Sequence, residues 1–230
     1  GRGIKRLQDA GVFVETNVGK KECDELNKRF FIFHKKKRPY IFLKWAQSAD
    51  GFMGRKGERF IFSTPKTLSL VHQMRYNEDA ILIGTNTAIE DNPSLTCRLA
   101  DGKNPIRLVL DRSLRIPFTH NLYDGSCRTV IFKEKLLPST KNKEKKKLDV
   151  SKDIISQIIQ FCYENKIMSL IVEGGSILLQ TFLEKGLYDE LRIEVSPMKL
   201  CEGVVAPRCD FSLMEYEEYD KNKIFWRRKV

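Results

Sequence analysis

The stretch Asp79-Ala-Ile-Leu-Ile-Gly-Thr-Asn-Thr-Ala-Ile-Glu-Asp-Asn-Pro-Ser-Leu-Thr-Cys-Arg98 decides the fold class. It joins an apolar run, typical of a buried strand, directly to the turn Gly84-Thr85-Asn86-Thr87. A strand that ends in glycine and small hydroxyl residues exposes backbone N–H groups at the N-terminus of a following helix, where phosphates are held. The stretch therefore favours an α/β fold with nucleotide chemistry.

Strand and helix patterns alternate from Arg38 onward, which indicates a mostly parallel sheet flanked by helices. Strands are predicted at residues 40–46, 80–84, 106–111, 129–132, 169–172, 190–196, 213–219 and 223–228. Helices are predicted at residues 65–76, 151–165 and 176–185. The helix at 176–185 begins directly after the turn Gly174-Gly175. The helix at 151–165 has Ser151 as its expected N-cap and Asp153 in its first turn. The last two strands are close in sequence, so they are expected to form an antiparallel edge hairpin.

Residues 1–37 are predicted to form a separate unit ahead of one domain at 38–230. This unit opens with a short amphipathic helix that Gly11 stops, followed by a strand-like segment at 12–15. Apolar positions from Lys20 to about His34 then recur close to helical spacing.

Composition narrows the classes of protein. A chain of 230 residues with 41% hydrophobic content suits one sizeable globular domain with an N-terminal appendage. No apolar run approaches the roughly 18 residues that span a bilayer, and no signal-peptide pattern is present, so no membrane partner and a cytoplasmic location are expected. The six cysteines form no C-x-x-C pair, and no histidine lies at zinc-ligand spacing from them, so no metal site is expected.

The net charge of +11 is compatible with nucleic acid, acidic lipid or a phosphorylated small molecule as partner. The densest basic run, 141–147, is interpreted as a polar connection and contains no interleaved aromatic residues. Single-stranded nucleic acids need such aromatic residues for stacking. The charge is therefore interpreted as solvated surface that also steers anionic ligands, and no nucleic-acid partner is expected.

The segment Glu173-Gly174-Gly175-Ser176 follows an apolar strand and opens a helix. Two glycines let a pyrophosphate approach the backbone, and the first N–H groups of the helix favour its negative charge. A tight strand-to-helix turn is the alternative, because the full G-x-G-x-x-G fingerprint is missing.

Two basic residues stand at positions that need an explanation. Arg112 follows a predicted strand at the edge where α/β sheets bind ligands, and a guanidinium there can clamp a 2′-phosphate. With Ser113 beside it, this favours NADPH, whereas an arginine in a surface turn is the alternative.

Lys44 lies inside an apolar strand, so it must reach solvent or meet a charged partner. A surface-facing lysine on an edge strand is the alternative there.

Several segments, in the same order along residues 1–207, resemble the reductase domain of the bifunctional riboflavin-biosynthesis deaminase/reductases. Besides the opening stretch, they are Leu43-Lys44-Trp45-Ala46-Gln47-Ser48-Ala49-Asp50-Gly51, Pro105-Ile106-Arg107-Leu108-Val109-Leu110-Asp111, Val172-Glu173-Gly174-Gly175 and Leu187-Tyr188-Asp189-Glu190-Leu191. The resemblance implies a dihydrofolate-reductase-like fold, a homodimer, and residues 1–37 as the end of a deaminase domain with its linker. The His-x-Glu and Pro-Cys-x-x-Cys zinc signature of that deaminase is absent from this chain.

The resemblance also implies an activity, the reduction of 5-amino-6-(5-phosphoribosylamino)uracil to 5-amino-6-(5-phosphoribitylamino)uracil by hydride transfer from NADPH. The residues that it places in catalysis are Lys44, Asp91 and Glu173. Those that it places around the phosphorylated substrate are Arg75, Leu95, Arg98 and Asp50. Those that it places around the cofactor are Phe60, Thr87, Asp91, Arg112, Ser113, Gly174, Gly175 and Ser176.

Some positions leave alternatives open. Arg75 suits a helix C-terminus and Arg98 a pairing with Glu90 or Asp91. A serine and a tryptophan of the family are replaced by Glu58 and Phe60. At the glycine pair, a backbone geometry closed to other residues is expected, including the rare cis peptide known in this fold. The alternative functions are a pterin or folate reductase of the same fold and a non-catalytic basic binding module.

Overall fold

The computed structural model describes residues 1–230 except 59, 98–101, 135–142 and 230. Within the described residues, one sheet of nine strands has the order β5-β4-β3-β2-β6-β1-β7-β9-β8. The strands are β1 (Tyr40–Gln47), β2 (Ala80–Gly84), β3 (Ile106–Leu110), β4 (Thr129–Lys133), β5 (Lys143–Lys147), β6 (Ser169–Gly174), β7 (Glu190–Val195), β8 (Glu215–Tyr219) and β9 (Asn222–Arg228). The helices are α1 (Arg2–Asp9), α2 (Lys20–Leu26), α3 (Lys28–Lys36), α4 (Pro65–Asn77), α5 (Thr85–Asp91), α6 (Ile154–Glu164) and α7 (Ser176–Glu184).

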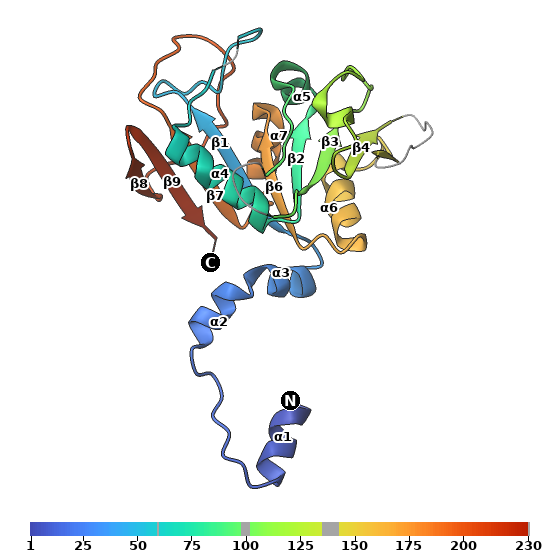
Figure 1. Ribbon diagram of the computed structural model, residues 1–230, viewed down its shortest axis with the longest axis vertical. Helices are drawn as coiled ribbons and strands as arrows, with labels where there is room; N and C mark the ends of the chain where they lie inside the picture. The colour runs from blue at the N-terminus through green and yellow to red at the C-terminus, as the bar shows by residue number, and fades with distance from the viewer. Residues whose placement is uncertain (59, 98–101, 135–142, 230) are drawn as a thin grey trace.

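Neighbouring strands from β5 to β7 pair in parallel, and β9 pairs antiparallel with both β7 and β8. This confirms the predicted mostly parallel α/β fold with a C-terminal antiparallel hairpin (Figure 1). No helix among the described residues has the length and apolar character needed to cross a bilayer.

The two faces of the sheet carry separate apolar cores, because successive strand residues point to opposite sides. On β1, Ile41 and Leu43 belong to the core under α6 and α7. Phe42 belongs to the opposite core, which includes residues of α4 and α5. The same alternation places Lys44 on the α4 and α5 side, where the functional cavity lies.

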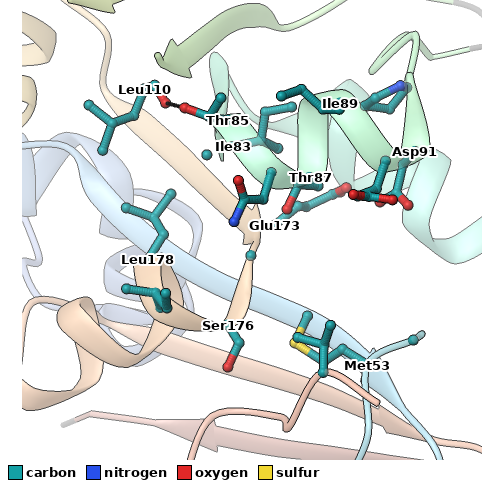
Figure 2. A pocket seen from close by; sticks show the side chains of 18 of the residues that line it. Met53, Ile83, Thr85, Thr87, Ile89, Asp91, Leu110, Glu173, Ser176 and Leu178 are labelled. Atoms are coloured by element: carbon teal, nitrogen blue, oxygen red, sulfur yellow. Dashed lines mark hydrogen bonds between the residues drawn. The ribbon is translucent and has the colours of Figure 1, made fainter. Parts of the chain in front are cut away.

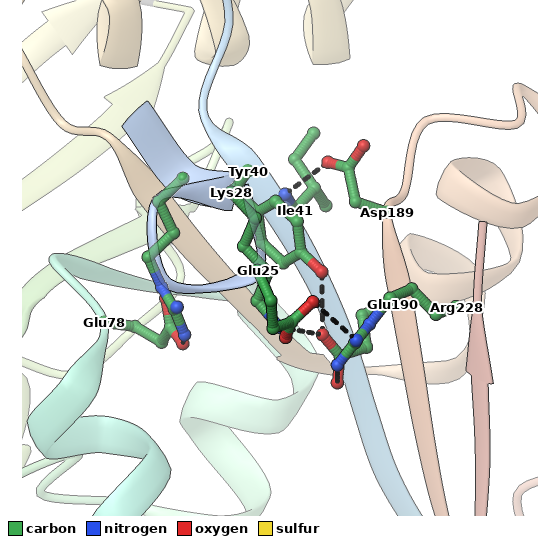
Figure 3. Close-up of polar contacts among 9 residues, drawn as sticks. Glu25, Lys28, Tyr40, Ile41, Glu78, Asp189, Glu190 and Arg228 are labelled. Carbon is green, nitrogen blue, oxygen red and sulfur yellow. Dashed lines mark hydrogen bonds and ion pairs between the residues drawn. The ribbon is translucent and has the colours of Figure 1, made fainter. Parts of the chain in front are cut away.

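Helix α3 attaches the N-terminal segment to the domain, whereas α1 lies away from the sheet in Figure 1. The ring of Phe33 on α3 is buried and packs 4.9 Å from that of Tyr163 on α6, measured between centroids. Figure 3 shows the polar contacts at the same junction, where Lys28 Nζ lies 3.2 Å from Glu190 Oε2. The neighbouring Glu25 pairs with Arg228 at 2.8 Å.

The structure corrects several local predictions. The strand-like segment at 12–15 forms no strand, and the pattern from Lys20 to His34 is divided into α2 and α3 at Asn27. The N-cap of α6 is Asp153, which accepts a hydrogen bond from the backbone N–H of Ser156 at 2.7 Å. Ser151 lies outside this helix because its hydroxyl donates to Asp149 at 2.6 Å.

The lysine-rich run predicted as a polar connection contains the edge strand β5. Parallel pairing with β4 supplies backbone hydrogen bonds along one side of β5. Charged side chains, lysine above all, are common on edge strands because they discourage further sheet pairing. A polar run was therefore an ambiguous signal, compatible with a loop and with a strand at the border of the sheet.

Candidate active site

One large cavity, of about 1670 Å³, lies at the carboxyl ends of the central strands. It is lined from β1 by Lys44, from β2 by Gly84, from β3 by Leu110 and from β6 by Glu173. Ligands of open α/β sheets bind at this edge. Typical small-molecule pockets occupy roughly 300–1,000 Å³, so this cavity has room for more than one ligand at a time.

The two glycine turns meet inside the cavity. A Cβ atom added to Gly84 would lie 3.8 Å from the carbonyl oxygen of Gly174, and one added to Gly175 would lie 3.0 Å from Thr87 Oγ1. The Gly174–Gly175 peptide bond is cis, which confirms the expected backbone geometry. Figure 2 shows Thr87 on α5 on the opposite side of this turn from Ser176 on α7.

The N-terminus of α7 is open to a ligand. Its N-cap is Gly175, and no side chain caps the first turn. The first N–H groups of a helix lack partners within the helix and carry a partial positive charge. Gly175 and Ser176 line the cavity, so this end can hold an anionic group there.

Buried charges form the floor of the cavity below α4. Arg75 donates two hydrogen bonds to Glu173, at 3.1 Å from Nε and 2.7 Å from Nη2. Burial by itself raises the pKa of Glu173, but Arg75 and then Lys44 outweigh it and hold that pKa below its usual range. The predicted substrate-phosphate residue Arg75 is thus bound to a predicted catalytic carboxylate.

Lys44 stands beside this pair on β1. It is partly exposed to the cavity, and burial is the main cause that lowers its pKa. Glu173 opposes this shift, whereas Arg75 and Arg192 add to it. The strand pattern that singled out Lys44 therefore located a residue at the ligand cavity, in place of a surface-facing edge lysine.

Two charged residues that lie buried behind the floor, outside the lining of the cavity, were missed from the sequence. Arg192 and Glu194 of β7 are fully buried. The carboxylate of Glu194 accepts hydrogen bonds from Ser63 at 2.8 Å and from Thr67 and Asn222 at 2.6 Å each. The signal was the charged residues at every second position of the strand, which places them on one face.

The far end of the cavity lies beyond β3. Arg112 and Ser113 line it, and Arg112 Nε donates to Glu134 Oε1 at 2.6 Å. Asp111 is buried and accepts hydrogen bonds from the backbone N–H groups of Arg115 and Ile116, each at 3.1 Å. Its carboxylate therefore shapes the turn, which leaves Arg112 and Arg115 as the charged side chains of this segment at the cavity.

The loop after β1 forms one wall. Phe52 forms a bridge with Val205, and the backbone N–H of Gly57 donates to Glu90 of α5 at 3.1 Å. Glu58 and Phe60 of this loop line the cavity. The wall thus links the loop to both the C-terminal segment and α5.

Asp50 is not among the cavity-lining residues. Its carboxylate accepts hydrogen bonds from Ser48 Oγ at 2.6 Å and from the backbone N–H of Cys201 at 2.7 Å. The Ser48 hydrogen bond is the largest cause that lowers the pKa of Asp50 to about 2, and the Cys201 bond adds to it. Asp50 thereby joins the loop after β1 to the loop after β7.

Most of the residues predicted for the site line the cavity. They are Lys44, Phe60, Arg75, Thr87, Asp91, Leu95, Arg112, Ser113, Glu173, Gly175 and Ser176. Gly174 directly precedes Gly175 in the chain, and Arg98 lies outside the described residues. His72 also lines the cavity and was missed, although it precedes Arg75 by three residues and so shares its helix face.

The profile of the RibD C-terminal domain family matches residues 39–208. The chain belongs to the RibD C-terminal domain family. It is 33% identical over 210 residues to the riboflavin biosynthesis protein RibD of Aquifex aeolicus, which covers 89% of this chain and 59% of that protein. The family named by the sequence motifs is therefore confirmed, and the chain spans about 59% of the length of that relative.

A second relative is matched over a larger share of its own length. The chain is 30% identical over 178 residues to the 2,5-diamino-6-ribosylamino-4(3H)-pyrimidinone 5′-phosphate reductase of Archaeoglobus fulgidus, covering 70% of this chain and 81% of that protein. This match involves a protein named for the reductase alone.

Solved structures confirm the fold. A deaminase/5-amino-6-(5-phosphoribosylamino)uracil reductase from Thermotoga maritima superposes with a TM-score of 0.88 at 29% identity, over all of this chain and 68% of that one. The dihydrofolate reductase of Enterococcus faecalis superposes over 83% of this chain and 97% of its own, with a TM-score of 0.51 at 16% identity, a likeness of fold alone.

Proposed function

We propose that this chain reduces 5-amino-6-(5-phosphoribosylamino)uracil to 5-amino-6-(5-phosphoribitylamino)uracil with NADPH, in riboflavin biosynthesis. The observation that carries the proposal is a single cavity in which an uncapped glycine turn faces a buried cationic floor. Such a cavity suits one anionic dinucleotide and one phosphorylated substrate, and the chain belongs to a family with relatives named for this pathway.

The residues present fit a nicotinamide dinucleotide. The backbone at Gly174 and Gly175 has no side chain between it and the cavity, and Thr87 approaches from the facing helix. We assign the pyrophosphate to this turn with Ser176, and the nicotinamide end to Phe60 and Asp91. When bound, the nicotinamide supplies the hydride that the reduction requires.

The opposite end of the cavity is assigned to the 2′-phosphate, held by Arg112 and Ser113. An arginine fork can bind a phosphate through two hydrogen bonds, which a free ribose hydroxyl cannot accept in the same way. Arg112 donates to Glu134 in this structure and would exchange that carboxylate for the phosphate. This is the basis for preferring NADPH to NADH.

The substrate is assigned to the floor and to the wall after α5. Lys44 orients the ribose hydroxyls, and Glu173 with its partner Arg75 fixes the sugar beside it. Leu95 is buried and takes a positive φ of 52°, which shapes the segment that leads to Arg98. We propose Arg98 and Arg75 as contacts of the substrate phosphate. Most of the rate would come from holding both reactants in one orientation in a closed site.

The proposal extends to the surroundings of the chain. We propose that residues 1–37 are the end of a deaminase domain and its linker, that the parent chain carries that domain, and that the protein is a cytoplasmic homodimer. The share of the RibD relatives that the chain leaves uncovered supports the further domain. Residues 38–230 then form the reductase domain.

The test is cofactor oxidation by the purified chain, which is measured as the loss of the absorbance of the reduced nicotinamide. NADPH should be oxidised when the phosphoribosylaminouracil is added, and not when dihydrofolate or a dihydropterin is added. Conversion of a pterin or folate in place of the sugar substrate would support the alternative reductase. Absence of any NADPH binding, measured by calorimetry, would support a non-catalytic module.

A further inference from the structure

Arg192 is a buried cation whose hydrogen-bonding capacity is largely unused. It is 0% exposed, and its Nε and Nη2 atoms have no hydrogen-bond partner among the described residues. Its Nη1 lies 3.0 Å from Met74 Sδ, and its guanidinium carbon lies 5.2 Å from the centroid of the Trp226 ring. A buried guanidinium that is not hydrogen-bonded to a carboxylate is costly, so its position calls for a reason beyond packing.

The position places Arg192 beside Lys44. The two residues are register partners on the neighbouring parallel strands β7 and β1, so their side chains lie on the same face of the sheet. The ionisable groups in and behind the floor that act on one another come from β1, β6, β7, β8 and α4. They are Lys44, Glu173, Arg192, Glu194, Tyr219, Arg75 and His72.

The carboxylates of this floor already have partners. Both oxygens of Glu173 accept from Arg75, and those of Glu194 accept from hydroxyl and amide groups. Within the described part of the chain, no ion pair joins Lys44 or Arg192 to either carboxylate. Two cations on adjacent strands therefore lie side by side without an ion pair of their own among the residues that the structure describes.

The two cations, Lys44 and Arg192, differ in how readily each loses its proton when it is buried beside another positive charge. A guanidinium keeps its proton at any ordinary pH, whereas a desolvated lysine next to a fixed positive charge gives its proton up. Burial lowers the pKa of Lys44, and Arg75 and Arg192 lower it further against the opposing effect of Glu173. Of the two neighbours, Arg75 is hydrogen-bonded to Glu173, whereas Glu194 and Glu173 act on Arg192 through space, so the charge of Arg192 is less fully compensated.

We propose that Arg192 is a positioning residue that keeps the Lys44 amine partly unprotonated, so that Lys44 relays a proton on the substrate sugar. This inference rests on the proposed function. In the relay, the bond from C1′ to the ring oxygen breaks with its electron pair on that oxygen, and a double bond forms between C1′ and the attached nitrogen. The Lys44 amine takes the proton from that nitrogen and returns it to the ring oxygen, which leaves an open-chain imine for reduction.

The first measurement follows Lys44 directly, by the carbon-13 shift of its ε-carbon in the full chain without substrate. Lys44 should titrate at least one pH unit below the ordinary lysine value of about 10.4. In Arg192→Met the midpoint should rise by about one unit or more, the effect of removing a unit charge from a buried neighbour. In Arg192→Lys, whose buried ammonium can itself lose its proton, the midpoint should lie between those of Arg192→Met and the wild type.

The second measurement is the pH profile of kcat. The pH at which kcat rises should move upward in Arg192→Met, and by less in Arg192→Lys. Trp226→Leu is the matched control, because it removes the stacking partner of Arg192 without removing a charge. It should lower the melting temperature and leave the profile where it is.

The outcomes separate the two proposals. A Lys44 midpoint near 10.4 in the wild type would overturn the inference, even if Arg192→Met fails to fold. An equal shift of the pH profile in Trp226→Leu would also overturn it, because packing would then be the cause. A lowered Lys44 midpoint that rises in Arg192→Met, in a chain that does not reduce the proposed substrate, would support the charge coupling and reject the proposed function.

Discussion

Replacing Glu173 by glutamine tests the charged floor most directly. The Glu173 and Arg75 side chains are 10% and 14% exposed, and they share a two-point hydrogen-bonded ion pair. The substitution keeps the shape of the side chain but removes its charge. Arg75, Lys44 and Arg192 would then share the floor with Glu194 as the remaining carboxylate named there.

The expected cost follows from this geometry. Removing one partner of a buried pair costs about 3–5 kcal/mol, and a glutamine that still accepts one hydrogen bond places the change near the lower limit. For a chain of this size, each kcal/mol corresponds to about 2–4 °C in melting temperature. We therefore expect Glu173→Gln to lower the melting temperature by about 6–12 °C.

The pH dependence has a defined sign. The pKa of Glu173 is lowered in the folded chain, because Arg75 and then Lys44 outweigh burial. A carboxyl of this kind stabilises the fold above its unfolded pKa, and the stabilisation is lost as the pH falls through the folded value. The difference in unfolding free energy between wild type and Glu173→Gln should therefore be full at neutral pH and shrink in acid.

Urea unfolding at several pH values measures this difference, and a double-mutant cycle with Arg75→Met isolates the pair. The double variant should lose less stability than the sum of the single variants, because neither charge is then left alone. Additive losses, or a cost for Glu173→Gln below about 1 kcal/mol, the range of exposed pairs, would refute the reasoning.

Three further predictions concern the cofactor assignment and the fold. Gly175→Val should abolish NADPH binding in a folded chain, since its Cβ would lie 3.0 Å from Thr87 Oγ1; wild-type affinity by calorimetry contradicts the assignment. Arg112→Ala should weaken NADPH by about 1.5–3 kcal/mol and NADH little, and equal losses would show that Arg112 does not contact the 2′-phosphate. Asp153→Ala should cost about 1 kcal/mol of unfolding free energy through loss of a helix cap, whereas an unchanged urea midpoint would exclude a capping role.

Much of the site could be predicted because it lies where short sequence patterns end. An apolar run closed by Gly84 determines a strand followed by a helix, since the glycine and the hydroxyl residues after it favour the change of backbone. The same logic applies at Gly174 and Gly175. Parallel strands place their carboxyl ends at one edge, so both turns were expected at the ligand site.

Local patterns could not determine which charges pair. Arg75 and Glu173 are separated by 98 residues, and their contact depends on how α4 packs across β6. The same holds for Asp50, whose partners include the backbone at Cys201, 151 residues away. Side-chain chemistry marked both residues as unusual, but the partner of each is set by the order of strands in the sheet.

The amino-acid sequence by itself determined most of the strands and helices of the domain and the two glycine turns, because each depends on neighbours within a few residues. The tertiary structure alone decided that Lys44 and Arg192 are adjacent, since their strands pair across 148 residues of chain. It also decided that β5 is a strand, because a lysine-rich segment extends only when a neighbouring edge accepts its backbone hydrogen bonds. Pairing between distant strands is a property of the whole fold, and it sets the electrostatics of the cavity floor.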